Sequence, residues 1–258
     1  MHSLVDIKLE IDKKVKLPFY WNDFIDQSDS PASLVIRSND ENSYYYGMDI
    51  FSLFSGSHVL YSNSGLLIDE EEWKKGILCI RGQEGQDIDS LLILFIYSHL
   101  IPKQTLLFHS SLVDLSGSGI MFLGPSGIGK TTQAELWNKY LGADILNGDM
   151  VFARKNEDGF YGYGSPWHGS SPYYKNAKVK LKALVVLEQA GENILKRLEG
   201  FDVLQGIMEQ VFLPHWYPEA MDTCLNTLDL LLEEVPVYHL ACRPDEDAVL
   251  LLKQELGL

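Results

Sequence analysis

The first hundred residues alternate short apolar or aromatic runs with breaks rich in Ser, Asn, Asp and Gly. Runs of this length and composition are typical of β-strands. They predict a mostly antiparallel sheet with strands at 34–36, 44–46, 59–61, 66–68 and 77–80. The polar stretch 85–89 then interrupts the pattern, and the apolar residues that follow predict a buried helix. Asp89 or Ser90 would cap this helix, which would run to about Leu100 and stop before Pro102.

The pattern changes after this helix, and we place a domain boundary there. Residues 1–102 would form a smaller, mostly β accessory region of α/β class, which is a candidate for substrate recognition. Residues 103–258 would form an α/β domain with a mixed sheet. Its predicted strands lie at 106–109, 111–115, 119–123, 144–149, 151–154, 160–163, 179–188 and 237–240. A first helix is predicted from 132 to about 142. Residues 202–234 show a helical period, and a last helix is predicted at about 245–255.

A glycine-rich segment lies between the strand 119–123 and the helix that follows it. Its residues are Gly124, Pro125, Ser126, Gly127, Ile128, Gly129, Lys130, Thr131 and Thr132. Glycines allow a tight turn in which successive backbone N–H groups converge on an anion, and the helix directs the positive end of its dipole there. The segment therefore predicts a phosphate-binding loop. Lys130 would reach the β- and γ-phosphates of a nucleotide triphosphate, and the Thr131 hydroxyl would ligate Mg²⁺.

Charge and composition narrow the range of partners. The chain has 36 acidic and 21 basic residues, and its net charge is −15. This field repels nucleic acid and anionic membranes, so we expect neither as a partner, and ATP would need a local positive pocket. The 3 cysteines form no metal-binding or disulfide pattern, and no segment reads as a signal peptide or a transmembrane helix. We therefore expect a cytoplasmic protein.

Three further positions are candidates for chemistry. A phosphotransferase needs a carboxylate near the γ-phosphate, and Asp149 follows the strand next to the loop, where it could bind Mg²⁺ or accept a proton. The alternative is an ordinary turn aspartate, since Asn-Gly-Asp is common in turns. His109 precedes the strand that leads to the loop and, on its own, reads as a core residue. Trp167 and His168 lie in the segment 164–171, which either covers a substrate or simply connects two strands.

The segments 108–113, 124–131 and 145–149 together resemble the catalytic domain of the HPr serine kinase/phosphorylase group. That group is similar in fold to the ATP-dependent phosphoenolpyruvate carboxykinases. The resemblance covers about 104–188 well and the C-terminal region loosely, and it does not extend to the first hundred residues. It implies that His109 contacts phosphate or substrate. The segment 164–171 is also similar to a Pro-Trp loop of divergent members, some of which are linked to peptide modification.

The chain departs from this family at one position. Members carry two adjacent acidic residues after the loop, of which the first is usually taken as the catalytic base, whereas this chain has Gly148 and Asp149. Asp149 would then serve both metal and base, or His109 or His168 would supply the base, or phosphoryl transfer has been lost.

The leading hypothesis is an ATP- and Mg²⁺-dependent kinase that phosphorylates a hydroxyl, on a peptide or protein serine or on a small molecule. The HPr protein itself is not the expected target, because the 164–171 loop differs from the segment that binds it. The alternative is a nucleotide-gated sensor or scaffold with little catalysis, in which ATP orders the Trp167–His168 loop. Carboxykinase chemistry is disfavoured because its metal-ligand set is not evident. A homo-oligomer is compatible with the sequence.

Overall fold

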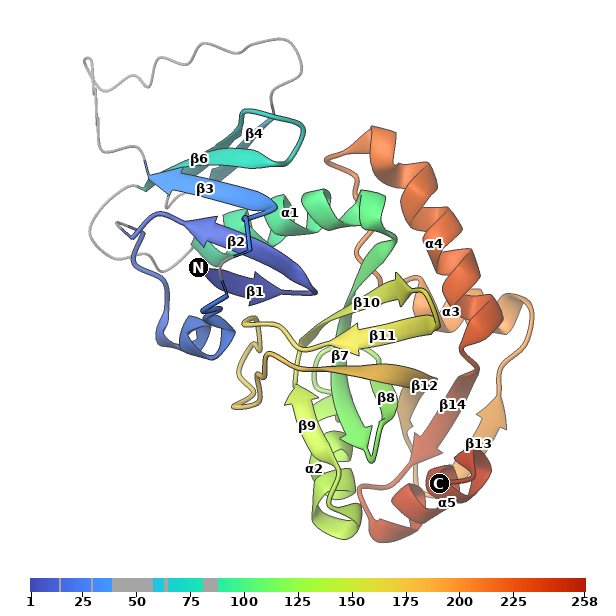
Figure 1. Cartoon of the computed structure of the whole chain (residues 1–258). Coiled ribbons are helices and arrows are strands. Elements are labelled where there is room, and N and C mark those ends of the chain that lie inside the picture. The colour runs from blue at the N-terminus through green and yellow to red at the C-terminus, as the bar shows by residue number, and fades with distance from the viewer. Residues whose placement is uncertain (14, 29, 39–57, 63–64, 81–87) are drawn as a thin grey trace. The chain divides into compact units, whose positions relative to one another are not determined.

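The computed structural model describes residues 1–13, 15–28, 30–38, 58–62, 65–80 and 88–258 (Figure 1). These residues divide into two compact units, Met1–Leu100 and Ile101–Leu258. The predicted strand at 44–46 lies outside the described residues. No helix in the described parts of the chain is long and apolar enough to span a bilayer.

The N-terminal unit is built on a mixed sheet with the strand order β1-β2-β3-β6-β5-β4. Its strands are β1 (His2–Leu4), β2 (Ile7–Ile11), β3 (Leu34–Ser38), β4 (Val59–Ser62), β5 (Gly65–Asp69) and β6 (Lys75–Ile80). Both neighbours of β3 run parallel to it, while the other described pairings are antiparallel. Three of the five described pairings are thus antiparallel, as predicted for most of this sheet, and the two pairings of β3 make the sheet mixed. The terminal hairpin β1–β2, which the apolar pattern did not reveal, places β2 beside β3.

A short 3₁₀ helix, η1 (Phe19–Phe24), and the helix α1 (Ile88–Leu100) complete this unit. Helix α1 buries apolar side chains that include Leu92, Phe95 and Ile96. Asp89 and Ser90 lie inside its first turn and do not cap it, because the helix already begins at Ile88. Asp89 instead accepts a hydrogen bond from the Tyr20 hydroxyl.

The C-terminal unit contains a second mixed sheet with the strand order β11-β10-β7-β8-β12-β14-β13. Strand β9 lies outside this order and pairs with β7. Its strands are β7 (Thr105–Leu115), β8 (Ser118–Leu123), β9 (Asp144–Asn147), β10 (Met150–Asn156), β11 (Gly159–Tyr163), β12 (Lys178–Gln189), β13 (Ile194–Arg197) and β14 (Val237–Cys242). An additional pairing of β11 with β12 closes β7, β8, β12, β11 and β10 into a ring. The sheet is parallel at its centre, where β12 lies between β8 and β14.

The two predicted strands at 106–109 and 111–115 are a single strand, β7. Ser110 and Ser111 join the two apolar runs, and both are fully buried. The Ser111 hydroxyl is satisfied by donating to the carbonyl of Lys130 at 2.9 Å. A buried serine that bonds to the backbone is therefore compatible with a continuous strand, although in the sequence it reads as a break.

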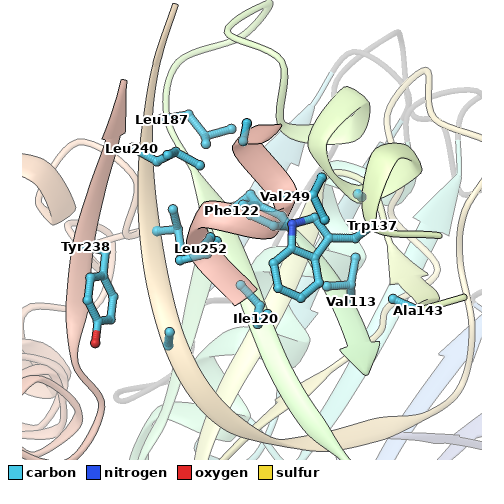
Figure 2. Packing of buried hydrophobic residues seen from close by; sticks show 14 of the residues in the cluster. Val113, Ile120, Phe122, Trp137, Ala143, Leu187, Tyr238, Leu240, Val249 and Leu252 are labelled. Atoms are coloured by element: carbon cyan, nitrogen blue, oxygen red, sulfur yellow. The ribbon is translucent and has the colours of Figure 1, made fainter. Parts of the chain in front are cut away.

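Helices α2 (Lys130–Leu141) and α5 (Glu246–Leu256) cover one face of this sheet and form its hydrophobic core. Figure 2 shows Trp137 of α2 packed among Val113, Phe122 and Val249, with Leu252 of α5 close by. Helix α2 ends where Gly142 adopts φ 69°, a left-handed conformation that suits glycine. This core fixes the start of α2 against the end of β8, where the glycine-rich loop lies.

The tail predicted as helical over 202–234 contains two separate helices, α3 (Phe201–Ile207) and α4 (Met221–Glu234). The intervening residues include Pro214 and Pro218, which interrupt a helix. Val211 in this segment forms a bridge with Phe108 of β7. Helix α4 packs on β7 and β11.

Candidate functional site

The glycine-rich loop connects β8 directly to α2, as the sequence predicted for this segment. Its three glycines adopt positive φ angles, 142° at Gly124, 80° at Gly127 and 114° at Gly129. Residues other than glycine rarely adopt these backbone conformations. Residues 125–127 of the loop are exposed. Gln189 at the end of β12 holds this part of the loop, because its side-chain amide donates a hydrogen bond to the Gly127 carbonyl at 3.2 Å.

Lys130 is the first residue of α2 and is only 6% exposed. Its ammonium group donates to the carbonyls of Gly124 at 2.8 Å and Pro125 at 3.2 Å, so it lies beneath the loop. Burial lowers the pKa of Lys130, and the nearby carboxylate of Asp149 partly opposes this shift. The Lys130 ammonium is therefore held beneath the loop by two neutral carbonyl groups.

Asp149 and His109 face each other across two neighbouring strands. The His109 Nε2 lies 3.1 Å from the Asp149 carboxylate, and both side chains are partly exposed. His109 pairs with Met150 in the register of β7 and β10, so Asp149 just precedes the paired segment. The backbone fixes Asp149 further, because its carbonyl accepts a hydrogen bond from the Ser110 N–H at 2.8 Å. The structure thus brings together Lys130, Asp149 and His109.

Asn147 organises this part of the site, although sequence reasoning treated it only as a turn residue. It is fully buried, and its side-chain oxygen accepts hydrogen bonds from the backbone N–H groups of Asp149 at 2.8 Å and Met150 at 2.9 Å. Its amide nitrogen donates to the Ser165 carbonyl at 2.8 Å. One side chain therefore holds both the strand end that carries Asp149 and the start of the 164–171 loop.

Gly148 has no room for a side chain. A Cβ atom built at this position would lie 1.9 Å from the Ser171 hydroxyl oxygen and 2.4 Å from its Cβ atom. Ser171 is itself buried, and its hydroxyl accepts a hydrogen bond from the Tyr173 N–H at 3.2 Å. On the other side, the Thr131 hydroxyl donates to the Gly148 carbonyl at 3.3 Å. Ser171 therefore occupies the volume that an acidic residue at position 148 would need.

The 164–171 loop folds over the strand end that carries Asp149. A Cβ atom at Gly169 would lie 2.8 Å from an oxygen of the Asp149 carboxylate, so the loop backbone approaches the Asp149 side chain closely. Trp167 is 7% exposed and packs edge-on against Phe152, with ring centroids 6.2 Å apart. The Trp167 indole thus anchors the loop to the sheet. His168 stacks on Tyr174 and hydrogen-bonds through its Nδ1 to the Ser171 carbonyl.

A pocket of about 370 Å³ opens on the side of the glycine-rich loop next to β12 and β14. Its walls include Gly127, Gly129, Gln133, Leu187, Gln189 and Cys242. Gln133 of α2 is 3% exposed, and its amide donates to the Cys242 sulfur at 3.2 Å. The pocket therefore adjoins the glycine-rich loop and the first turn of α2.

Comparison with known proteins agrees with the resemblance expected from the sequence. The chain is 22% identical over 163 residues to the HPr kinase/phosphorylase of Brevibacillus brevis. The chain resembles the HPr kinase/phosphorylases. The match covers 62% of this chain and 49% of the relative, so the chain spans about half the length of the curated relative it matches. No protein-family model matches.

Among solved structures, the HPr(Ser) kinase/phosphatase of Coxiella burnetii matches with 12% identity and a TM-score of 0.34. This match covers 58% of the present chain and 88% of that chain.

Proposed function

We propose that this protein is an ATP- and Mg²⁺-dependent kinase that transfers the γ-phosphate to a hydroxyl group. The observation that supports this proposal most strongly is the placement of the buried Lys130 ammonium beneath the glycine-rich loop and close to Asp149. The sequence similarity to an HPr kinase/phosphorylase points to the same chemistry. The hydroxyl acceptor would be a serine or a small alcohol.

The loop suits a triphosphate. The turn at Gly127 and Gly129 leaves backbone N–H groups at the start of α2, and the helix dipole favours an anion there. Among the residues that the structure describes, the Lys130 ammonium donates to the loop carbonyls of Gly124 and Pro125, and these neutral contacts can be exchanged for phosphate oxygens. The adjoining pocket of about 370 Å³ lies in the size range of small-molecule and cofactor sites and would take the base and sugar.

The protein donors for Mg²⁺ would be the Thr131 hydroxyl and the Asp149 carboxylate. The described residues contain no group of three or more His, Cys, Asp or Glu side chains placed to bind a metal. This donor set fits Mg²⁺ nonetheless, because Mg²⁺ is usually held by one or two protein ligands together with water and substrate phosphates. When bound, Mg²⁺ would neutralise part of the phosphate charge.

Asp149 would also accept the proton of the attacking hydroxyl, and His109 would orient its carboxylate. In this reaction the acceptor oxygen forms a bond to the γ-phosphorus, the bond to the β-phosphate oxygen breaks, and ADP leaves. The hydroxyl proton passes to an Asp149 oxygen. Ser171 occupies the space of the missing acidic residue at position 148, so Asp149 is the carboxylate that remains for this role.

The second candidate is a nucleotide-gated sensor with little phosphotransfer. It is favoured by the same Gly148 position, since the usual base of the related kinases is replaced there. Asp149 and the 164–171 loop would then respond to bound ATP without chemistry.

Product analysis with γ-labelled ATP separates the two candidates. The protein is incubated with Mg²⁺, labelled ATP and either serine-containing peptides or small alcohols, and the label is followed by chromatography. Label on an acceptor that is lost in Asp149→Asn supports the kinase. ATP that stays bound and intact in the presence of every acceptor supports the sensor and contradicts the kinase proposal.

A further inference from the structure

The C-terminal unit exposes an apolar stripe along α3 and the residue that follows it. Phe201 is 76% exposed, Leu204 40% and Met208 37%. Their spacing of three and four residues places them on one side of the helix. Exposed apolar residues that occur singly are ordinary, but a continuous stripe of large side chains marks an interaction surface.

A groove of about 300 Å³ runs between this helix and α4. Val203 and Leu204 of α3 and Leu232 of α4 supply its apolar walls. Asp229 and Glu233 of α4 add two carboxylates to the same groove. Neither carboxylate forms an ion pair with any residue that the structure describes, so both remain available to a partner.

The charge pattern decides between the occupants that an apolar groove could take. A second copy of the chain that used the same face would place Asp229 and Glu233 near their own counterparts, and every copy has a net charge of −15. A segment with apolar side chains on one side and Lys or Arg beside them would fill the apolar walls and pair with both carboxylates. The groove therefore fits a basic amphipathic peptide, in the way that helices bind grooves.

The groove is connected to the proposed active site by a short piece of backbone. Three residues after α3, the Gln210 carbonyl accepts a hydrogen bond from the His109 N–H at 2.8 Å. The next residue, Val211, forms the bridge with Phe108. A segment that lies along α3 toward its C-terminal end is thus directed to the strand that carries His109.

We propose that the groove between α3 and α4 docks a basic, amphipathic polypeptide segment whose serine is the acceptor of the phosphoryl group. This inference rests on the proposed kinase function and narrows its acceptor to a peptide. The docked segment leaves its serine near Asp149, where the serine oxygen attacks the γ-phosphorus of ATP, ADP leaves, and Asp149 takes the proton.

The test uses a fluorescein-labelled synthetic peptide of about 15 residues, with leucines at helical spacing, lysines beside them and one serine near each end. A second peptide has glutamate in place of every lysine. Binding to the full chain is measured by anisotropy without nucleotide. Leu204→Ser and Glu233→Lys alter the groove. Their matched controls on α5 are Leu250→Ser, which changes a leucine that is 44% exposed against 40% for Leu204, and Glu255→Lys.

We expect the lysine peptide to bind, and the glutamate peptide to bind at least about tenfold more weakly. Leu204→Ser and Glu233→Lys should each weaken lysine-peptide binding by about tenfold, as at interface hot spots, while both controls bind like the wild type. With labelled ATP, the bound peptide should become phosphorylated on serine.

Equal binding of the two peptides, equal losses in the controls, or no binding would overturn the docking proposal. A concentration-dependent dimer in sedimentation that Leu204→Ser abolishes would assign the groove to a second copy instead. Calorimetry with ATP keeps this inference separate from the kinase proposal. If ATP binds and its γ-phosphoryl group is transferred to a small alcohol, leaving ADP, while no peptide docks, only the docking inference fails.

Discussion

Gly148 and Ser171 share one volume, because a Cβ atom at Gly148 would lie 1.9 Å from the Ser171 hydroxyl oxygen. An acidic residue at position 148 and a serine at position 171 therefore exclude each other in this fold. The contact links the strand end before Asp149 to the 164–171 loop across 23 residues of sequence. Gly148 thus has two effects: it removes a carboxylate from the site, and it makes room for Ser171.

The first expectation concerns this pair. Gly148→Asp should destabilise the protein by about 1–3 kcal/mol, the usual cost of overpacking a filled site. The double variant Gly148→Asp with Ser171→Gly should recover much of this loss, since it removes the hydroxyl and Cβ atoms that clash. Urea unfolding of the two variants, with Ser171→Gly alone as the control, measures the coupling. Additive effects of the two substitutions would show that the residues do not compete for space.

Asn147→Ala should loosen the site from within. The substitution removes the acceptor for the N–H groups of Asp149 and Met150 and the donor to the Ser165 carbonyl. Leaving these partly or fully buried groups unpaired costs about 1–3 kcal/mol for each group that finds no water. Hydrogen exchange should increase at 148–150 and 165–167, whereas Asn226→Ala on the exposed side of α4 should leave it unchanged. Unaltered exchange in Asn147→Ala would contradict the organising role.

Asp149→Asn should impair turnover much more than nucleotide binding. The amide keeps the shape of the side chain but cannot accept the proton, so kcat for phosphoryl transfer should fall by at least about 100-fold. His109→Gln should cause a smaller loss because His109 acts on the orientation of Asp149. His215→Gln, which changes another exposed histidine, is the control. If kcat and ATP affinity fell equally in Asp149→Asn, Asp149 would be a binding residue only.

Lys130 gives a pH-dependent effect on stability. Burial lowers its pKa in the folded protein, so the charged form is disfavoured there relative to the unfolded chain. The cost is fully present below the folded pKa and declines as the pH rises toward the ordinary lysine value. Lys130→Met should therefore raise the Tm at neutral pH, and the gain should shrink as the pH approaches about 10. A gain that is constant with pH would indicate a packing effect.

Much of the C-terminal unit could be predicted from the sequence because it depends on local backbone conformation. The glycine-rich loop, the end of α2 at Gly142 and the hairpin at Gly159 each require a positive φ angle, which glycine adopts easily. The family resemblance implied that His109 contacts phosphate or substrate, but it did not indicate that His109 faces Asp149, because that contact depends on the pairing of β7 with β10.

Long-range packing explains what the sequence did not reveal. The clash between Gly148 and Ser171 depends on how the 164–171 loop folds back, and the anchor role of Trp167 depends on its contact with Phe152. The parallel pairings of β3 with β2 and with β6 likewise depend on how distant segments meet in the sheet, not on the composition of β3. The helical period over 202–234 predicted one continuous helical region for a related reason. The sequence did not reveal that the segment around Val211 leaves the helix and pairs with β7.

The most direct test of the whole account is titration calorimetry with Mg²⁺ and ATP on the wild type and on Lys130→Ala. The account expects one ATP to bind per chain and the affinity to fall at least about tenfold in Lys130→Ala, since the buried ammonium is lost from the loop. Thr223→Ala, on α4 away from the loop, should bind like the wild type. No heat of binding in the wild type, or equal affinity in Lys130→Ala, would contradict the central claim.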